Sequence, residues 1–334
     1  MITIVGGGLA GLSLGIALCR RGVAVTLHEA GSYPRHRVCG EFISGVSNRT
    51  FDSLGIGDLF NDAKRHHSTI WFSRARKILT AQLPVGLGIS RFTLDARLSR
   101  RFRELGGVLC EHSRQKPRIE NGLVCCAGRM PARGNWIGLK CHVLGLKLHA
   151  DLEMHLASNG YVGLANVEHE KVNVCGLFRL QLGLSGKGIE TLERYLCAGG
   201  LDALALRIFA AGVDAESFLG VAGFRLGWQK PRDETAALGD AFGMIPPFTG
   251  NGMSMAFESA EIAADRLNAW QAGRRTWAET LERLNEELKL RFARRMFWGQ
   301  AMHPFLTTGT GQAFFTLVSR SGLLPFKTCF HALR

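Results

Sequence analysis

Three glycines near the start of the chain, Gly6, Gly8 and Gly11, have the spacing G-x-G-x-x-G. Because glycine has no side chain, such a turn lets the backbone approach a bound group closely and point its N–H groups at a phosphate. The pattern alone is weak evidence, and its meaning depends on the elements beside it. A phosphate site needs the turn to join a strand to the start of a helix.

The flanking residues supply that context. The apolar run 2–5 predicts a strand, residues 9–21 have the apolar spacing of a helix, and a second β-run, 23–29, ends on Glu29. A strand, glycine turn, helix and strand closed by an acid form the dinucleotide fingerprint, in which the helix N-terminus meets the pyrophosphate and the acid meets the ribose. The sequence therefore predicts an α/β Rossmann-like domain, and this motif leaves open whether FAD or NAD is bound.

Two stretches farther along the chain could also face a nucleotide. An apolar-to-Gly-Asp turn at Asp240 precedes the G-N-G loop 250–252, and a helical pattern begins near Met253. A loop that feeds a helix N-terminus suits an anion or a carbonyl oxygen, and an aspartate can accept a hydrogen bond from a sugar hydroxyl. Within residues 90–102, Arg91 stands at the start of another helical pattern.

The three motifs follow one another along the chain in the family's order, from residue 1 to about 270. Together they resemble the FAD-dependent oxidoreductases of the para-hydroxybenzoate hydroxylase type. That superfamily includes aromatic monooxygenases, flavin-dependent halogenases and geranylgeranyl reductases. The resemblance implies FAD as cofactor and NAD(P)H as electron donor. The residues expected to bind the cofactor are Gly6, Gly8, Ala10, Gly11, Glu29, Arg37, Arg91, Asp240, Gly250, Asn251, Gly252 and Met253.

Residues 34–41, PRHRVCGE, resemble the P-x-x-K-x-C-G-E segment of the geranylgeranyl reductase and halogenase-like branch. The resemblance implies that this segment passes near flavin and substrate. Cys39 then has two interpretations, which stay open: a catalytic proton donor beside the flavin, or a small residue that permits close packing. Arg35 and Arg37 could neutralise a pyrophosphate or an acidic group of the substrate.

The chain also departs from the family pattern. Ala127 stands where the hydroxylases carry an aspartate that helps to bind FAD and NADPH, and residues 161–166 lack the tryptophans of the halogenase W-x-W-x-I-P motif. Halogenation and hydroxylase-like docking of NADPH are therefore disfavoured. No group of side chains has convincing metal-ligand spacing, and no G-x-S-x-G nucleophile turn is present.

We expect a Rossmann-like domain with an inserted antiparallel substrate sheet and a C-terminal helical tail. The expected divisions are 1–72, 91–139 and 233–275 for FAD binding, 73–90 and 140–232 for the β-rich domain, and 276–334 for the tail. In the β-rich domain we expect one covered and one variable sheet face, and a strand pair within 218–228.

The tail has an unusual composition. Residues 288–334 contain seven Lys or Arg and no Asp or Glu, together with eight Phe or Trp. Such a segment could contact an anionic membrane surface or an acidic partner. It could equally pack its aromatic rings on the body of the protein and leave its charges in water. We expect no nucleic-acid partner, and no apolar run is long enough to cross a membrane.

Composition and cysteine spacing indicate the kind of protein and the cellular compartment to expect. With 46% apolar and 21% charged residues the chain is globular. Nine cysteines without paired spacing, and no basic segment ahead of an apolar one, favour free thiols in a cytoplasmic protein, with possible contact to a membrane through the tail. The oligomeric state stays open.

The leading functional hypothesis is an FAD-dependent monooxygenase that hydroxylates an apolar, aromatic or polyketide-like small molecule through a flavin C4a-hydroperoxide, as the resemblance implies. The flavin carries that chemistry, so no protein nucleophile is needed. One alternative is a geranylgeranyl-reductase-like enzyme that saturates C=C bonds of a prenyl or lipid substrate. Another is a flavin-binding protein without turnover.

Overall fold

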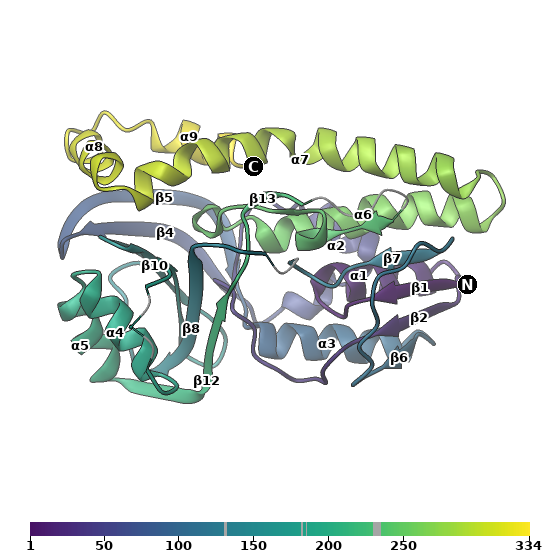
Figure 1. The fold of residues 1–334 in the computed structure, drawn as a ribbon, viewed down its shortest axis with the longest axis horizontal. Coiled ribbons are helices and arrows are strands. Elements are labelled where there is room, and N and C mark those ends of the chain that lie inside the picture. The colour runs from purple at the N-terminus through teal and green to yellow at the C-terminus, as the bar shows by residue number, and fades with distance from the viewer. Residues whose placement is uncertain (130–131, 182, 185, 230–234) are drawn as a thin grey trace.

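The computed structural model describes residues 1–129, 132–181, 183–184, 186–229 and 235–334, and these residues build two sheets side by side under one long helix (Figure 1). The first sheet is parallel, with strand order β14-β7-β1-β2-β6. Its strands are β1 (Ile2–Val5), β2 (Val25–His28), β6 (Val108–Cys110), β7 (Leu123–Cys125) and β14 (Ala236–Ala237). Its helices are α1 (Leu9–Cys19), α2 (Asn48–Leu54), α3 (Arg91–Glu104) and α6 (Gly252–Gln271).

The second sheet has the order β12-β8-β11-β10-β9-β4-β5-β3, and only its β4–β9 pair is parallel. Its strands are β3 (Phe42–Ile43), β4 (Lys64–Ser73), β5 (Arg76–Gly88), β8 (Trp136–Leu144), β9 (Leu152–Ala157), β10 (Gly160–Asn166), β11 (Lys171–Arg179) and β12 (Gly212–Ala222). The remaining helices are α4 (Glu190–Ala198), α5 (Asp202–Phe209), α7 (Trp277–Thr307), α8 (Gly309–Arg320) and α9 (Phe326–Ala332). Short elements complete the list: β13 (Gly227–Trp228), β15 (Gly243–Met244), and the 3-10 turns η1 (Gly57–Phe60), η2 (Gly239–Ala241) and η3 (Pro247–Thr249).

Helix α1 lies at the centre of the first layer. It is apolar on every side, and all its residues except Cys19 are buried, because α3 and α6 cover the faces that β1 does not. Small residues allow this crowding: a Cβ on Gly15 would lie 2.7 Å from the ring of Phe102. The helix ends at Cys19 with Arg20 as its cap, and Gly22, at φ +76°, turns the chain in the left-handed conformation ahead of β2.

The second sheet is covered on both faces, which corrects the expectation of one variable face. Helices α4 and α5 pack on one side, in a cluster that includes Leu139, Val162 and Tyr195. Residues of α7 and α8, among them Leu306 and Phe315, cover the other side. The sequence pattern hid this, because the polar residues of β9 that alternate with apolar ones are themselves buried in ion pairs.

Two further expectations need correction. The predicted strand pair within 218–228 is wrong, because β12 is one strand from Gly212 that pairs with β8, while β13 pairs with β15. An irregularity between Asp214 and Leu219 breaks the alternation that would have revealed the longer strand. The discontinuous division into domains stays a proposal. Its first boundary moves ahead of β4, since β4 pairs with β5 and β9, and the boundary at 232/233 lies outside the described residues.

None of the helices described here is long and apolar enough to cross a membrane.

The first prediction concerns the contact between the glycine turn and α1. A Cβ on Gly11 would lie 2.1 Å from the carbonyl oxygen of Gly6, so Gly11→Ala must push the helix off the strand. We expect a loss of about 2 kcal/mol in the free energy of unfolding, measured by urea denaturation. Gly309→Ala is the matched control, because nothing lies within 4 Å of a Cβ there. Equal stability of the two variants would contradict this packing.

Candidate functional site

The glycine turn presents the open end of α1. Gly6 has φ +106°, and a Cβ there would lie 2.3 Å from the carbonyl oxygen of Cys126, so only glycine fits. Gly8 caps α1 without any side-chain hydrogen bond, and the first turn of the helix holds no acid. The positive end of the helix dipole and its N–H groups therefore suit the negative charge of a phosphate. Ala10 packs beneath this turn, 3.2 Å from the position of a Cβ on Gly239.

Glu29 lies at the carboxyl end of β2, next to this turn. Its buried carboxylate accepts hydrogen bonds from the N–H of Gly7 at 2.8 Å and of Gly31 at 3.0 Å. Arg35 and Arg37 reach it at 2.6 and 3.4 Å. Burial raises the pKa of Glu29, but the hydrogen bonds and the arginine charges outweigh it, so the pKa lies below its ordinary value. The group is an ionised acceptor, as a partner for ribose hydroxyls must be.

Tyr33 was not predicted to take part in the site. Its hydroxyl donates a hydrogen bond to the carbonyl of Gly7, and a Cβ on Gly7 would collide with that hydroxyl. The ring thus lies against the glycine turn beside Glu29. A tyrosine shortly after the acid of the second strand is the only sign of this in the sequence.

Arg91 and Asp240 lie on either side of the turn. Arg91 binds Asp95 through two hydrogen bonds, at 2.7 and 2.8 Å, and its guanidinium comes within 3.9 Å of a Cβ placed on Gly8. Burial raises the pKa of Asp240, although the charges of Arg91 and Arg129 oppose the rise. The structure therefore brings the second and third motifs to the same place as the first. Arg37 is bound to the acids of this group, 3.9 Å from Asp95 as well as to Glu29.

The loop 250–253 offers a free polar atom. Asn251 is buried and donates from Nδ2 to the carbonyl of Thr249 at 2.8 Å, whereas its Oδ1 has no hydrogen-bond partner among the described residues. Gly250, at φ +66°, is pressed against Phe42, and Gly252 has open space where a Cβ would be. Met253 is buried below them in the first turn of α6. The free oxygen lies beside Gly45, 2.9 Å from the position of a Cβ there, and an unpaired buried acceptor fits a hydrogen-bonding ligand.

Cys39 lies beside Arg91 and Glu41. Burial raises the pKa of its thiol, although the charge of Arg91 opposes the rise, so the thiol stays protonated at neutral pH. Its carbonyl accepts a hydrogen bond from Asn173 at 3.0 Å, which ties the segment to β11. Both interpretations of Cys39 remain compatible with this position, and a catalytic role for it remains a proposal.

Glu41 is the centre of a buried polar network that the sequence did not predict. It has φ +52° and is fully buried. One carboxylate oxygen accepts from the N–H of Arg91 at 2.9 Å and lies 3.3 Å from Lys140, and the other lies 2.6 Å from Nε2 of His142. The network therefore joins the start of α3 to strand β8, across the boundary between the two sheets.

A histidine pair lies at the edge of this network. His36, His142 and Asp214 place three potential ligand atoms within 4.8 Å of one another. Burial and the charge of Lys140 lower the pKa of His36 to about 4, and Lys140 lies 3.2 Å from its Nδ1. A lysine in contact with one of the three side chains disfavours a cation there, so we assign no metal to this group.

An aromatic cluster includes Phe248, which lies in the turn η3 just ahead of Gly250. The ring of His303 is 5.1 Å from Trp136, 6.0 Å from Tyr161 and 6.2 Å from Phe248. Burial, with the charge of Arg179, lowers the pKa of His303 to about 4, so the ring is neutral at physiological pH. Its Nε2 is buried without a hydrogen-bond partner among the described residues.

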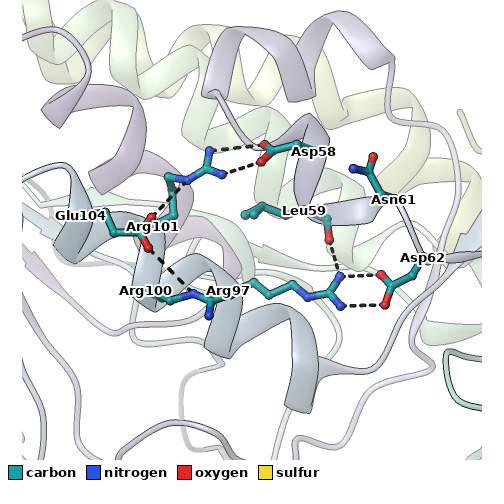
Figure 2. Close-up of a pocket in the computed structure, with 8 residues that line it drawn as sticks. All are labelled: Asp58, Leu59, Asn61, Asp62, Arg97, Arg100, Arg101 and Glu104. Carbon is teal, nitrogen blue, oxygen red and sulfur yellow. Dashed lines mark hydrogen bonds and ion pairs between the residues drawn. The ribbon is translucent and has the colours of Figure 1, made fainter.

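A cavity of about 370 Å³ lies elsewhere, between η1 and α3, as Figure 2 shows. Its charged walls are satisfied by each other: Arg97 pairs with Asp62 at 2.5 Å, and Arg101 pairs with Asp58 at 2.5 Å. These pairs fasten the turn to the helix, and no predicted site residue lines the cavity. It does not belong to the candidate site.

Comparison with known proteins decides the cofactor. Residues 1–127 match the family profile described as an FAD binding domain, and no curated protein sequence matches the chain. The N-terminal part of the chain, residues 1–127, is therefore similar to an FAD binding domain. The match confirms the α/β FAD-binding domain and the cofactor expected from the motifs.

Three solved structures share the whole fold. PqsL, described as a probable FAD-dependent monooxygenase from Pseudomonas aeruginosa, is 15% identical with a TM-score of 0.71, covering 96% of this chain and 98% of that one. The p-nitrophenol 4-monooxygenase PnpA from Pseudomonas putida is 15% identical with a TM-score of 0.75, covering 98% of both chains. HpxO of Klebsiella pneumoniae, complexed with FAD and uric acid, is 15% identical with a TM-score of 0.74, covering 100% of this chain and 96% of that one. The chain thus has the same fold as these three structures, two of which are named monooxygenases.

The second prediction uses the buried network of Glu41. Burial raises the pKa of Glu41, but the hydrogen bond of His142 and the charge of Lys140 lower it more, so the folded pKa lies below the ordinary value. Such a group stabilises the fold above its unfolded pKa of about 4.3, and the contribution disappears as the pH falls through the folded pKa. Glu41→Gln should therefore cost about 3 kcal/mol at neutral pH, and the difference from wild type should shrink below about pH 4.

Urea unfolding at a series of pH values measures this difference. The control is Glu216→Gln, which changes an exposed glutamate and should shift stability by less than about 0.5 kcal/mol. A cost for Glu41→Gln that is the same at every pH would contradict the ion-pair account.

Proposed function

We propose that this protein is an FAD-dependent monooxygenase that hydroxylates a small, apolar aromatic molecule. The observation that carries the proposal is that Phe248, two residues ahead of the loop 250–253, belongs to a neutral aromatic cluster with His303 and Tyr161. A flat apolar substrate stacks on such rings, and the unpaired nitrogen of His303 suits a ring hydroxyl or amino group.

The structural relatives support this substrate class. PqsL has been solved with 2-aminobenzoylacetate and HpxO with uric acid, both small ring compounds. PnpA is named for its action on p-nitrophenol. The comparisons lend no support to the alternative of a geranylgeranyl-type reductase.

The site residues can be assigned roles toward FAD, and these roles are part of the proposal. Glu29 would bind the ribose, and the N-terminus of α1 would bind the pyrophosphate together with Arg91. Asp240 would bind the chain between the phosphates and the ring system. The loop 250–253 would support the ring system, and Asn251 Oδ1 fits one of its N–H groups. The bound flavin would supply the oxygen-transfer chemistry.

The chain itself contributes position and dryness. Phe248 is held through its N–H, which donates to the hydroxyl of Tyr161 at 3.2 Å. Helix α7 closes over the Pro-Pro loop, since a Cβ on Gly299 would lie 3.1 Å from Ile245 and 3.3 Å from Pro246. The covering helix excludes water from the place where substrate and flavin meet, which favours productive oxygen transfer over side reactions.

NAD(P)H is the proposed electron donor. The donor would supply two electrons and one proton as a hydride, and a second proton would come from the medium, because one oxygen atom of O₂ enters the substrate and the other leaves as water. Ala127 lies directly against Gly6, since a Cβ on Gly6 would be 2.6 Å from its Cα. If Ala127 stands where the hydroxylases carry their aspartate, as the resemblance implies, it provides no charge there, which supports a different mode of docking for the donor.

Contact with a membrane is a further part of the proposal. Residues 288–334 carry seven basic residues and no acidic one. This charge supports an anionic lipid surface as a partner of the tail. The protein would then encounter an apolar substrate at the membrane, where such a compound is concentrated.

The third prediction tests the reaction class. The FAD-loaded protein is mixed with NADPH and a panel of hydroxy- and amino-substituted aromatic compounds under isotopically heavy O₂. A substrate should accelerate NADPH oxidation and consume oxygen, and its product should carry one heavy oxygen atom. Heavy water under ordinary O₂ is the control and should leave no label. A product made without oxygen consumption would contradict the proposal and indicate a reductase or dehydrogenase.

A further inference from the structure

The solvent-facing side of α7 is apolar over its second half. Leu290, Phe297 and Phe305 are 83%, 64% and 41% exposed, at a spacing of seven and eight residues that places them along one side of the helix. Trp298, 43% exposed, stands against the ring of Phe297 at 5.4 Å. A solvent-facing stripe on a helix normally carries polar residues, so this face lacks a partner in the described chain.

Helix α8 continues the same surface. Phe305 and Phe314 lie 5.8 Å apart, so the stripe passes from one helix to the next without a break. Phe314 is 56% exposed, Leu317 69%, and Leu323 just beyond the helix 76%. We call the exposed apolar residues of this surface the α7–α8 face: Leu290, Phe297, Trp298, Phe305, Phe314, Leu317 and Leu323. The two helices lie along one side of the molecule, with α7 running over both sheets and α8 at the end beside β5 (Figure 1).

Basic residues border the α7–α8 face, and one of them, Arg294, lies within the α7 stripe, three residues before Phe297. Lys289, Arg294, Arg320 and Lys327 are exposed, and no acidic residue occurs between 288 and 334. Arg291 and Arg295 play another part, because Glu258 of α6 holds them at 2.7 and 2.9 Å. Exposed aromatic rings beside uncompensated lysines and arginines are the composition of a helix that lies in the interface of an anionic membrane.

The charge also separates the candidate partners. A second copy of the chain on this face would bring two basic borders together, and like charges across an interface oppose association. An anionic lipid surface attracts the same border, at about 1 kcal/mol for each lysine or arginine near it. The charges therefore favour a membrane over a dimer.

We propose that the α7–α8 face is a docking surface for an anionic bilayer, with the aromatic rings inserted among the acyl chains and the basic border at the headgroups. This gives the membrane contact of the proposed function its residues and its orientation. It also places beside the lipid a groove of about 630 Å³ between β5 and the segment after α8, whose walls include Leu79, Leu324 and Phe326. Docking itself does not depend on the flavin reaction.

The fourth prediction is vesicle binding. The full-length protein is sedimented with vesicles of phosphatidylcholine and phosphatidylglycerol, and with vesicles of phosphatidylcholine alone. We expect binding to the anionic vesicles that is weakened by high salt, and much weaker binding to the neutral ones. The double variant Phe297→Ser with Phe314→Ser should lose affinity at least about tenfold, because both rings leave the interface.

The control variant is Leu206→Ser. Leu206 on α5 is 74% exposed and lies on the opposite side of the second sheet from α7 and α8, so its loss should leave vesicle binding unchanged. All the changed residues are exposed, and unchanged thermal unfolding would show that each variant folds.

A fluorescence experiment tests whether Trp298 enters the bilayer. Brominated lipids should quench part of the tryptophan emission of wild type, and Trp298→Phe should remove that quenched part. Absence of binding by the wild type, or equal binding to both kinds of vesicle, would overturn the proposal. Equal loss in the Leu206→Ser control would overturn the assignment to this face. Because no turnover is measured, these outcomes are independent of whether the monooxygenase proposal holds.

Discussion

The carboxylate of Glu41 is the contact on which the joining of the two sheets depends. It receives the N-terminal N–H of α3, a helix of the nucleotide layer, and it binds the lysine and histidine of β8 in the second sheet. All three charged or polar side chains are buried, so removing one partner would leave the others unpaired in a medium where that is expensive. The neighbouring Cys39, Arg91 and Asn173 are held in place by the same segment. The junction between the parallel sheet layer and the second sheet is thus held by buried charges as well as by apolar packing.

The nucleotide side shows a similar principle. Glu29, Asp95 and Arg91 are paired within the protein, and Tyr33 lies on the glycine turn. The site therefore consists of groups already held in position by opposite charges. FAD would join or replace these contacts rather than order a flexible loop, which makes the site preorganised.

Local patterns made much of the fold predictable. The β-α-β unit around Gly6 to Glu29 follows from glycine conformations and apolar spacing, which act within about 30 residues. The gathering of Arg91 and Asp240 beside Gly8 was expected only through the family resemblance, because it depends on the path of the chain across two sheets. The Glu41 network was missed for a physical reason: a buried lysine, histidine and glutamate look like surface residues in a sequence until their partners are known. The same holds for Glu153 and His155. Their polar side chains suggest a sheet face open to water, although both are buried and paired with each other. Tyr33 was missed because its contact with Gly7 depends on how the chain folds back on the glycine turn.

The measurement that tests the central claim most directly is a crystal structure of the protein with FAD bound. The account predicts the ribose hydroxyls on the Glu29 carboxylate, the pyrophosphate at the N-terminus of α1 beside Arg91, and the ring system over residues 250–253 within reach of Asn251 Oδ1. It would be contradicted by FAD bound elsewhere, or by a ring system that leaves Asn251 unpaired and does not reach the aromatic cluster around His303.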